Sequence, residues 1–242
     1  MSISRIDYGE LAAPSAEPEA RSGSRPKRRH SLVRFPLRVV KWALLAVILA
    51  VLPFLLLIRG GVFAYQQWEL QPWLALAVSA TATTLLLALY ALVASRRIGA
   101  GKGLTKLMTR AAALLACAYV VYSVMFVAVG NVKSDEVRAE YTALHPLLRL
   151  GASALILVDS ESVITDAGRT PDFYRRMGLP PNEASLHFEQ ESGFVHALDL
   201  RTIGRSDRRN RAVEIAFRVM GFHTLRHVGT ADHLHVSLRV EE

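Results

Sequence analysis

Histidine is concentrated in the last quarter of the chain, where its spacing is typical of metal binding. Six of the eight histidines fall between His187 and His235. Alternate residues of a strand share a face, so His233 and His235 would present two imidazoles together. His187 would reach Asp199 if residues 189–193 form the tip of a hairpin. Imidazole and carboxylate ligands around an open fourth position suit a catalytic zinc ion, which lowers the pKa of its water so that a nearby carboxylate can take the proton.

Other histidines and acidic residues of this region fit such a site less well. His196 lies three residues before the aspartate and would point to the opposite face of a strand, so we expect it to face solvent. His223 and His227 are expected to line a loop or a strand edge. Glu189 and Glu191 are expected at the exposed hairpin tip, and one of them becomes a ligand only if the register of the hairpin is shifted.

The elements that must position these residues are short and of mixed type. Helices are predicted over 134–150, 171–177 and 207–220, the last with Ser206 or Asp207 as its N-cap and Gly221 as its stop. Strands are predicted over 154–158, 163–165, 194–200 and 233–240. Together they indicate a small α+β domain with a short antiparallel sheet over residues 131–242.

Three apolar runs precede this domain, in a chain that is 51% hydrophobic. They cover Val39–Ile58, Trp73–Ala94 and Ala111–Val129, and each matches the roughly 20 residues that cross a bilayer as a helix. We therefore expect a disordered basic tail over 1–35 and a three-helix transmembrane region over 36–130. The runs carry no Asp, Glu or His at mid-depth, which argues against a transport or proton-relay role.

The charge of the chain is divided between these parts. Residues 1–130 contain 15 basic and 5 acidic residues, whereas residues 131–242 contain 14 basic and 16 acidic ones. The basic excess therefore flanks the membrane runs and does not indicate nucleic-acid binding. Basic residues stay on the cytoplasmic side, so the tail and the loop with Arg96, Arg97 and Lys102 are expected there. Three crossings then place the C-terminal domain on the far side of the membrane, outside the cytoplasm.

Five short motifs of the C-terminal domain resemble the zinc D-alanyl-D-alanine carboxypeptidase and Hedgehog-type peptidase superfamily. The resemblance covers roughly residues 141–238, and the motifs occur in the family's order. They are Val163–Pro171, Ser185-Leu186-His187, Ala197-Leu198-Asp199-Leu200, Gly221-Phe222 after a helix, and Asp232-His233-Leu234-His235.

This resemblance implies a set of roles for individual residues. His187, Asp199 and His235 would hold zinc, and Asp232 would be the general base in the place of the family's Glu. Arg169 would steady the substrate carbonyl or the developing oxyanion, and Ser185 would help to position the substrate. The implied activity is hydrolysis of D-alanine-containing peptidoglycan peptides. Two alternatives remain open at this point: a module that binds wall peptides or a partner protein without cleaving them, and a structural membrane protein with an accessory domain.

Overall fold

The computed structural model describes residues 31–176, 178, 180, 184–229 and 232–238. The chain divides into two compact units, Met1–Leu44 and Leu45–Glu242. Of the first unit the structure describes the beginning of helix α1 (Ser31–Gln67). Most of the tail predicted over 1–35 therefore lies outside the described residues, while residues 31–35 already belong to α1.

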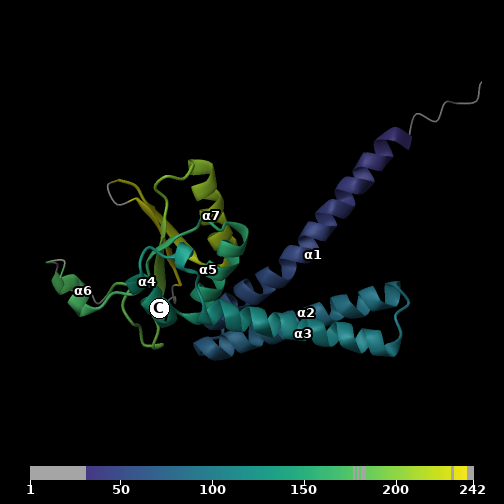
Figure 1. Ribbon diagram of the computed structural model, residues 1–242, viewed down its shortest axis with the longest axis horizontal. Coiled ribbons are helices and arrows are strands. Elements are labelled where there is room, and N and C mark those ends of the chain that lie inside the picture. Colours follow the sequence, from purple (N-terminus) through teal and green to yellow (C-terminus); the bar gives the residue numbers. More distant parts are fainter. Residues whose placement is uncertain (1–30, 177, 179, 181–183, 230–231, 239–242) are drawn as a thin grey trace, which may run out of the picture. The chain divides into compact units, whose positions relative to one another are not determined.

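Three long apolar helices precede the C-terminal domain. They are α1, α2 (Pro72–Arg97) and α3 (Lys102–Met125). Their candidate membrane spans contain 30, 26 and 24 residues with a mean hydropathy of 2.5, 2.0 and 1.6, enough to cross a bilayer. Helices α2 and α3 run side by side as a hairpin (Figure 1). The predicted membrane region is confirmed to this extent: the described part of the chain has three helices of the required length and composition.

Most helix ends lie beyond the predicted ones because apolar character understates helix length, whereas α3 ends at Met125, four residues before the predicted end at Val129. Helix α1 continues to Gln67, through the segment expected to be the first loop. Helix α3 begins at Lys102, so the second loop shortens to residues 98–101. Charged residues at helix ends can extend toward water while their backbone stays helical, which explains why the apolar runs stop early.

The helix expected over 134–150 is broken into two. Helix α4 (Asp135–Glu140) is followed by the 3-10 turn η2 (Tyr141–Ala143), and helix α5 (Pro146–Val158) begins after it. The break falls at His145, which has an extended backbone because the α conformation is disfavoured before a proline. Helix α5 continues through Val158, so the strand predicted over 154–158 is wrong.

The C-terminal domain contains a four-stranded antiparallel sheet with the strand order β1-β2-β4-β3. The strands are β1 (Ile164–Asp166), β2 (Ala197–Arg201), β3 (His223–His227) and β4 (His233–Ser237). The helices α6 (Pro171–Arg176) and α7 (Asp207–Met220) match the predicted ones, with Ser206 capping α7 and Gly221 ending it in the left-handed conformation. Strand β3 was not predicted: its residues His223 and His227 were expected to line a loop or a strand edge.

The two faces of the sheet have opposite character, as strand alternation requires. One face carries Leu198, Leu200, Leu234 and Val236, all buried against an apolar core to which α5 and α7 also contribute. The other face carries Asp199 and His235. The fold therefore keeps the apolar core and the candidate ligands on separate sides of one sheet.

Candidate metal centre

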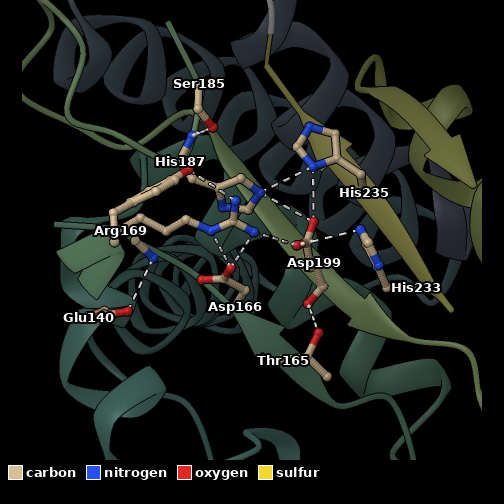
Figure 2. Close-up of polar contacts among 11 residues, drawn as sticks. Glu140, Thr165, Asp166, Arg169, Ser185, His187, Asp199, His233 and His235 are labelled. Carbon is tan, nitrogen blue, oxygen red and sulfur yellow. Dashed lines mark hydrogen bonds and ion pairs between the residues drawn. The ribbon is translucent and has the colours of Figure 1, made fainter. Parts of the chain in front are cut away.

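Three of the predicted ligands converge at one point. His187 Nε2 lies 3.2 Å from His235 Nδ1, and both nitrogens lie close to Asp199 Oδ1, at 3.3 and 2.9 Å respectively. His187 and Asp199 are buried, and His235 is partly exposed toward a pocket. Figure 2 shows the two imidazoles and the carboxylate directed at a common centre. These residues could hold a metal ion.

Strand register explains the position of two of these ligands. Asp199 lies in the middle of β2 and pairs directly with His235 on β4. Directly opposed side chains of an antiparallel pair lie on the same face, with Cβ atoms about 4.5–5.5 Å apart. The register of β2 and β4 therefore fixes the distance between the carboxylate and one imidazole.

The third ligand comes from the irregular segment between α6 and β2. The carbonyl oxygen of His187 accepts a hydrogen bond from the Arg169 backbone N–H at 2.8 Å. The neighbouring Leu186 carbonyl accepts one from the His196 N–H at 2.9 Å, and the His187 N–H donates to Ser185 Oγ at 3.3 Å. These bonds hold the segment beside β2, as the predicted hairpin requires.

The distances between the ligand atoms suit a small divalent cation. An ion bonded at about 2.0–2.2 Å to tetrahedrally arranged ligands leaves those ligands roughly 3.3–3.6 Å apart. Two of the observed distances, 3.2 and 3.3 Å, are close to this range, and the third, 2.9 Å between His235 Nδ1 and Asp199 Oδ1, is that of a hydrogen bond. Without a cation or proton between them, the lone pairs of these three atoms would oppose one another. The donor set and its spacing therefore fit a metal ion with at least one further coordination position.

The electrostatics of Asp199 favour its ionised form. Burial would raise the pKa of this carboxyl, but hydrogen bonds from His187 and His235, together with nearby positive charge, hold the pKa below its usual range. The second oxygen, Oδ2, lies 3.5 Å from Arg169 Nη2 and 3.7 Å from His233 Nε2. Asp199 is thus a charged ligand in a setting that stabilises its charge.

Arg169 is brought to the site and fixed there by two neighbours. Its Nε donates to Asp166 Oδ2 at 2.7 Å, and its Nη1 lies 3.4 Å from the Tyr174 hydroxyl. Burial alone would lower the pKa of the guanidinium, but these partners and Asp199 raise it on balance. Arg169 is therefore a positioned cation beside the three ligands (Figure 2).

A pocket of about 340 Å³ opens over the centre. Ser185 and Arg169, the residues predicted to contact a substrate, both line this pocket. Strand β3 forms another wall because it pairs with β4, placing Leu225 opposite His235 and His227 opposite His233. The residues of β3 in the lining are His223, Leu225 and His227.

The contribution of β3 is the part of the site that sequence reasoning missed. The rings of His227 and His233 stack with their centroids 4.5 Å apart. The segment His223-Thr224-Leu225-Arg226-His227 gives little sequence signal, because its one apolar residue, Leu225, is exposed while the polar Thr224 is buried. A strand is recognised from alternating apolar residues, and this short polar segment has no such alternation.

The structure does not bring Asp232 to the ligands. Asp232 precedes β4 by one residue and lies close to Arg226, whose Nε donates to it at 2.9 Å, and to Thr202, whose hydroxyl donates at 2.7 Å. These hydrogen bonds lower the pKa of the carboxyl, the one from Arg226 most strongly. Asp232 is not among the residues lining the pocket, whereas the adjacent His233 is.

His196 is buried, which corrects the expectation that it faces solvent. Its Nε2 lies 2.7 Å from Ser192 Oγ and 3.4 Å from the Tyr65 hydroxyl. The ring of His145 packs against it at a centroid distance of 5.1 Å. Both imidazoles are kept neutral by burial, which lowers the pKa of His196 to about 4 and that of His145 to about 2. The pair belongs to the packing of the domain and not to the metal centre.

The chain has no match among protein-family models, curated proteins or solved structures. The candidate metal centre is defined by its own residues, which come from three separate parts of the sequence. Two ligands lie on paired strands and one on a loop, and a fixed arginine and two stacked histidines stand beside them.

Proposed function

We propose that the C-terminal domain is a zinc-dependent hydrolase that cleaves D-alanine-containing peptides of the bacterial cell wall. The observation that carries this proposal is the convergence of His187, Asp199 and His235 beneath a polar pocket. Two imidazoles and one carboxylate with an open position are the ligand set of many catalytic zinc sites. Zinc held there would supply Lewis-acid chemistry, polarising a peptide carbonyl and lowering the pKa of water.

Arg169 would hold the part of the substrate that carries or develops negative charge. Its guanidinium lies beside Asp199 and lines the same pocket. Donors fixed in advance stabilise a developing oxyanion without reorganisation. Asp166 and Tyr174 provide that fixation, and Ser185 on the pocket wall would orient the peptide.

We assign proton transfer to His233 and not to Asp232. The His233 ring lines the pocket, with its Nε2 3.7 Å from Asp199 Oδ2. From this position the imidazole would accept the proton of the attacking water and return it to the leaving amine. Asp232 is held by Arg226 and Thr202 instead.

The membrane helices support a location for this activity. Arg96 and Arg97 end α2, and Lys102, Lys106 and Arg110 lie in the first turns of α3, so five basic residues gather at one end of the α2–α3 hairpin. The ends of membrane helices that are rich in Lys and Arg stay on the cytoplasmic side. We infer that the N-terminus is cytoplasmic and the C-terminal domain periplasmic, where wall peptides are found.

Metal content and turnover test the proposal directly. The full chain, purified in detergent, is expected to carry about one zinc, and His187→Ala or His235→Ala should abolish tight binding because two protein ligands rarely hold catalytic zinc. His223→Ala is the matched control, since it lines the same pocket without belonging to the three ligands, and should keep the metal. Elemental analysis of each purified protein measures the zinc bound per chain.

Turnover of D-alanine-terminated peptides should disappear with a chelator and return with zinc. A protein without bound metal, or one whose metal survives His187→Ala, would contradict the proposed centre.

A second function, binding without cleavage, is favoured by one observation. Asp232, in the place of the family's catalytic Glu, is engaged in an ion pair outside the pocket. A domain without a working base would still hold peptides through the metal and Arg169. Retention of wall peptides by the zinc-loaded protein, with no product released, would favour this function.

A further inference from the structure

A second hollow lies among helices α1, α5 and α7, apart from the metal pocket. It has a volume of about 540 Å³. Its walls are apolar side chains, and the two charged residues in its lining, Asp159 and Arg209, form an ion pair with each other. Because this pairing leaves the groove without a charge to attract a polar ligand, its shape and chemistry suit a hydrocarbon chain. We call this hollow the α1–α7 groove.

One wall of the α1–α7 groove belongs to a membrane span. Val51, Phe54 and Ile58 line the groove and lie within the candidate span Arg38–Gln67. At 1.5 Å per residue, Ile58 is about 14 Å from the Gln67 end of α1, less than the thickness of the hydrocarbon layer. Val51 and Phe54 are also 45% and 41% exposed. The groove is therefore continuous with a surface that faces lipid.

The rim of the α1–α7 groove resembles a helix at a membrane surface. Val158 at the end of α5 is 89% exposed, and Ile215 and Val219 on α7 are exposed as well. Arg208 lies seven residues before Ile215 and eleven before Val219, on the same side of the helix. Arg211 lies four residues before Ile215, about one helical turn away. Neither arginine forms an ion pair with a described residue. Exposed aliphatic side chains next to unpaired arginines are typical of helices that contact anionic lipid.

We propose that the α1–α7 groove binds one hydrocarbon chain of an anionic phospholipid, whose headgroup contacts Arg208 and Arg211. The helices that form the groove pack on the sheet face opposite the candidate metal centre. The lipid would therefore join the C-terminal domain to the bilayer without entering the pocket. This inference does not depend on the proposed hydrolase activity.

Lipid retention by the full chain tests this proposal. The protein is reconstituted in vesicles of equal phosphatidylcholine and phosphatidylglycerol, extracted in mild detergent, and examined by native mass spectrometry. We expect one retained phosphatidylglycerol per chain. Ala216→Trp fills the groove from α7 and should reduce the retained fraction by about tenfold or more, as expected when several methylene contacts are lost. Ala118→Trp, at an exposed position of α3 outside the groove, should not.

Two further variants separate the chain site from the headgroup site. Arg208→Gln with Arg211→Gln should keep a retained lipid but remove the preference for phosphatidylglycerol. Ile215→Ser with Val219→Ser is a milder change than a tryptophan substitution, and it should weaken lipid retention in a protein whose melting temperature shows that it is folded. Equal retention by the parent and Ala216→Trp proteins would overturn the proposal. So would a dimer that Ala216→Trp dissociates, because the groove would then be covered by a second copy of the chain.

Discussion

At the scale of single side chains, the parity of strand positions decides which residues reach the candidate centre. Asp199 and His235 are directly paired, and His233 lies two residues along the same face. Asp232 lies one position before His233 and accepts hydrogen bonds from Arg226 and Thr202 instead. A shift of one residue in a strand moves a side chain to the other face. Asp232 is therefore not beside the ligands in space, although it lies only three residues before His235 in the sequence.

Proton transfer is predicted to fail with His233→Gln and to survive Asp232→Asn. The first variant should lower kcat/KM by about 100- to 10,000-fold, the usual contribution of a general base, while keeping its zinc. The second should stay close to the parent in turnover, since its carboxylate is engaged elsewhere. Steady-state kinetics on a D-alanine-terminated peptide, with metal content measured in parallel, distinguishes them. The reverse pattern would identify Asp232 as the base.

The buried pair His145 and His196 predicts a loss of stability in mild acid. Unfolding restores a pKa near 6.5, whereas burial lowers the pKa of His196 to about 4. Below pH 6.5 the unfolded chain therefore binds a proton that the folded chain does not. The free energy of unfolding falls by up to about 1.4 kcal/mol per pH unit for each such imidazole. For His196 this loss is complete near pH 4.

His196→Gln should make the decline between pH 6 and pH 4 shallower. The measurement is the melting temperature of the detergent-solubilised protein at several pH values, with a chelator present so that metal release plays no part. The slope is the readout, because the substitution also changes stability at neutral pH. An unchanged slope would show that His196 is not the titrating group.

At the scale of elements, α5 is the helix to which both the membrane helices and the sheet domain attach. Pro146 begins it, and His145 Nδ1 accepts the Leu147 N–H at 3.2 Å as a cap. Gly151 lies where Phe222 crosses the helix, and a Cβ there would come within 2.7 Å of the Phe222 ring. Phe222 is itself buried and packs edge-to-face on Phe217, so its ring cannot move aside.

Gly151→Ala is predicted to destabilise the protein despite the higher helix propensity of alanine. That propensity contributes about 1 kcal/mol, while overpacking a closed core costs about 1–3 kcal/mol, so the melting temperature should fall. Gly103→Ala is the matched control, because this position is in α3 and has open space around its Cβ. It should leave the melting temperature unchanged or raise it. A rise in the melting temperature of both variants would contradict the close contact between Gly151 and Phe222.

At the scale of the whole molecule, buried polar groups join the C-terminal domain to the membrane helices. Arg149 of α5 donates from Nη1 to the Val124 carbonyl at 2.6 Å, and the Tyr141 hydroxyl lies 3.0 Å from the Ser123 carbonyl. Carbonyls in the last turn of a helix have no partner within it, so these side chains satisfy the end of α3. The guanidinium also lies over the rings of Trp73 and Phe194.

Membrane orientation provides a prediction at this scale. A reporter that is active only outside the cytoplasm should work when fused after Glu242 and fail when inserted after Ala100, between α2 and α3. The reason is the cluster of basic residues at that end of the hairpin. Activity in the opposite pattern would place the C-terminal domain in the cytoplasm and would contradict a role on wall peptides.

The sequence alone determined the features that depend on local periodicity and composition. Long apolar runs predicted three helices of membrane-spanning length, and alternation predicted the strands that carry Asp199 and His235. Ser206 and Gly221 marked the ends of α7. The three candidate ligands were also identified, although the choice among six histidines came from a resemblance and not from spacing.

Tertiary structure decided whatever depends on which segments meet. The pairing of β3 with β4 brought His223 and His227 to the pocket, and this pairing follows from long-range packing that a five-residue polar segment does not reveal. Packing against Tyr65, which is 131 residues away, buried His196. Asp232, one position before β4, pairs with Arg226 of β3 and does not meet the ligands. In each case a contact distant in sequence or across a turn outweighed local preference, because burial and pairing are set by the whole fold.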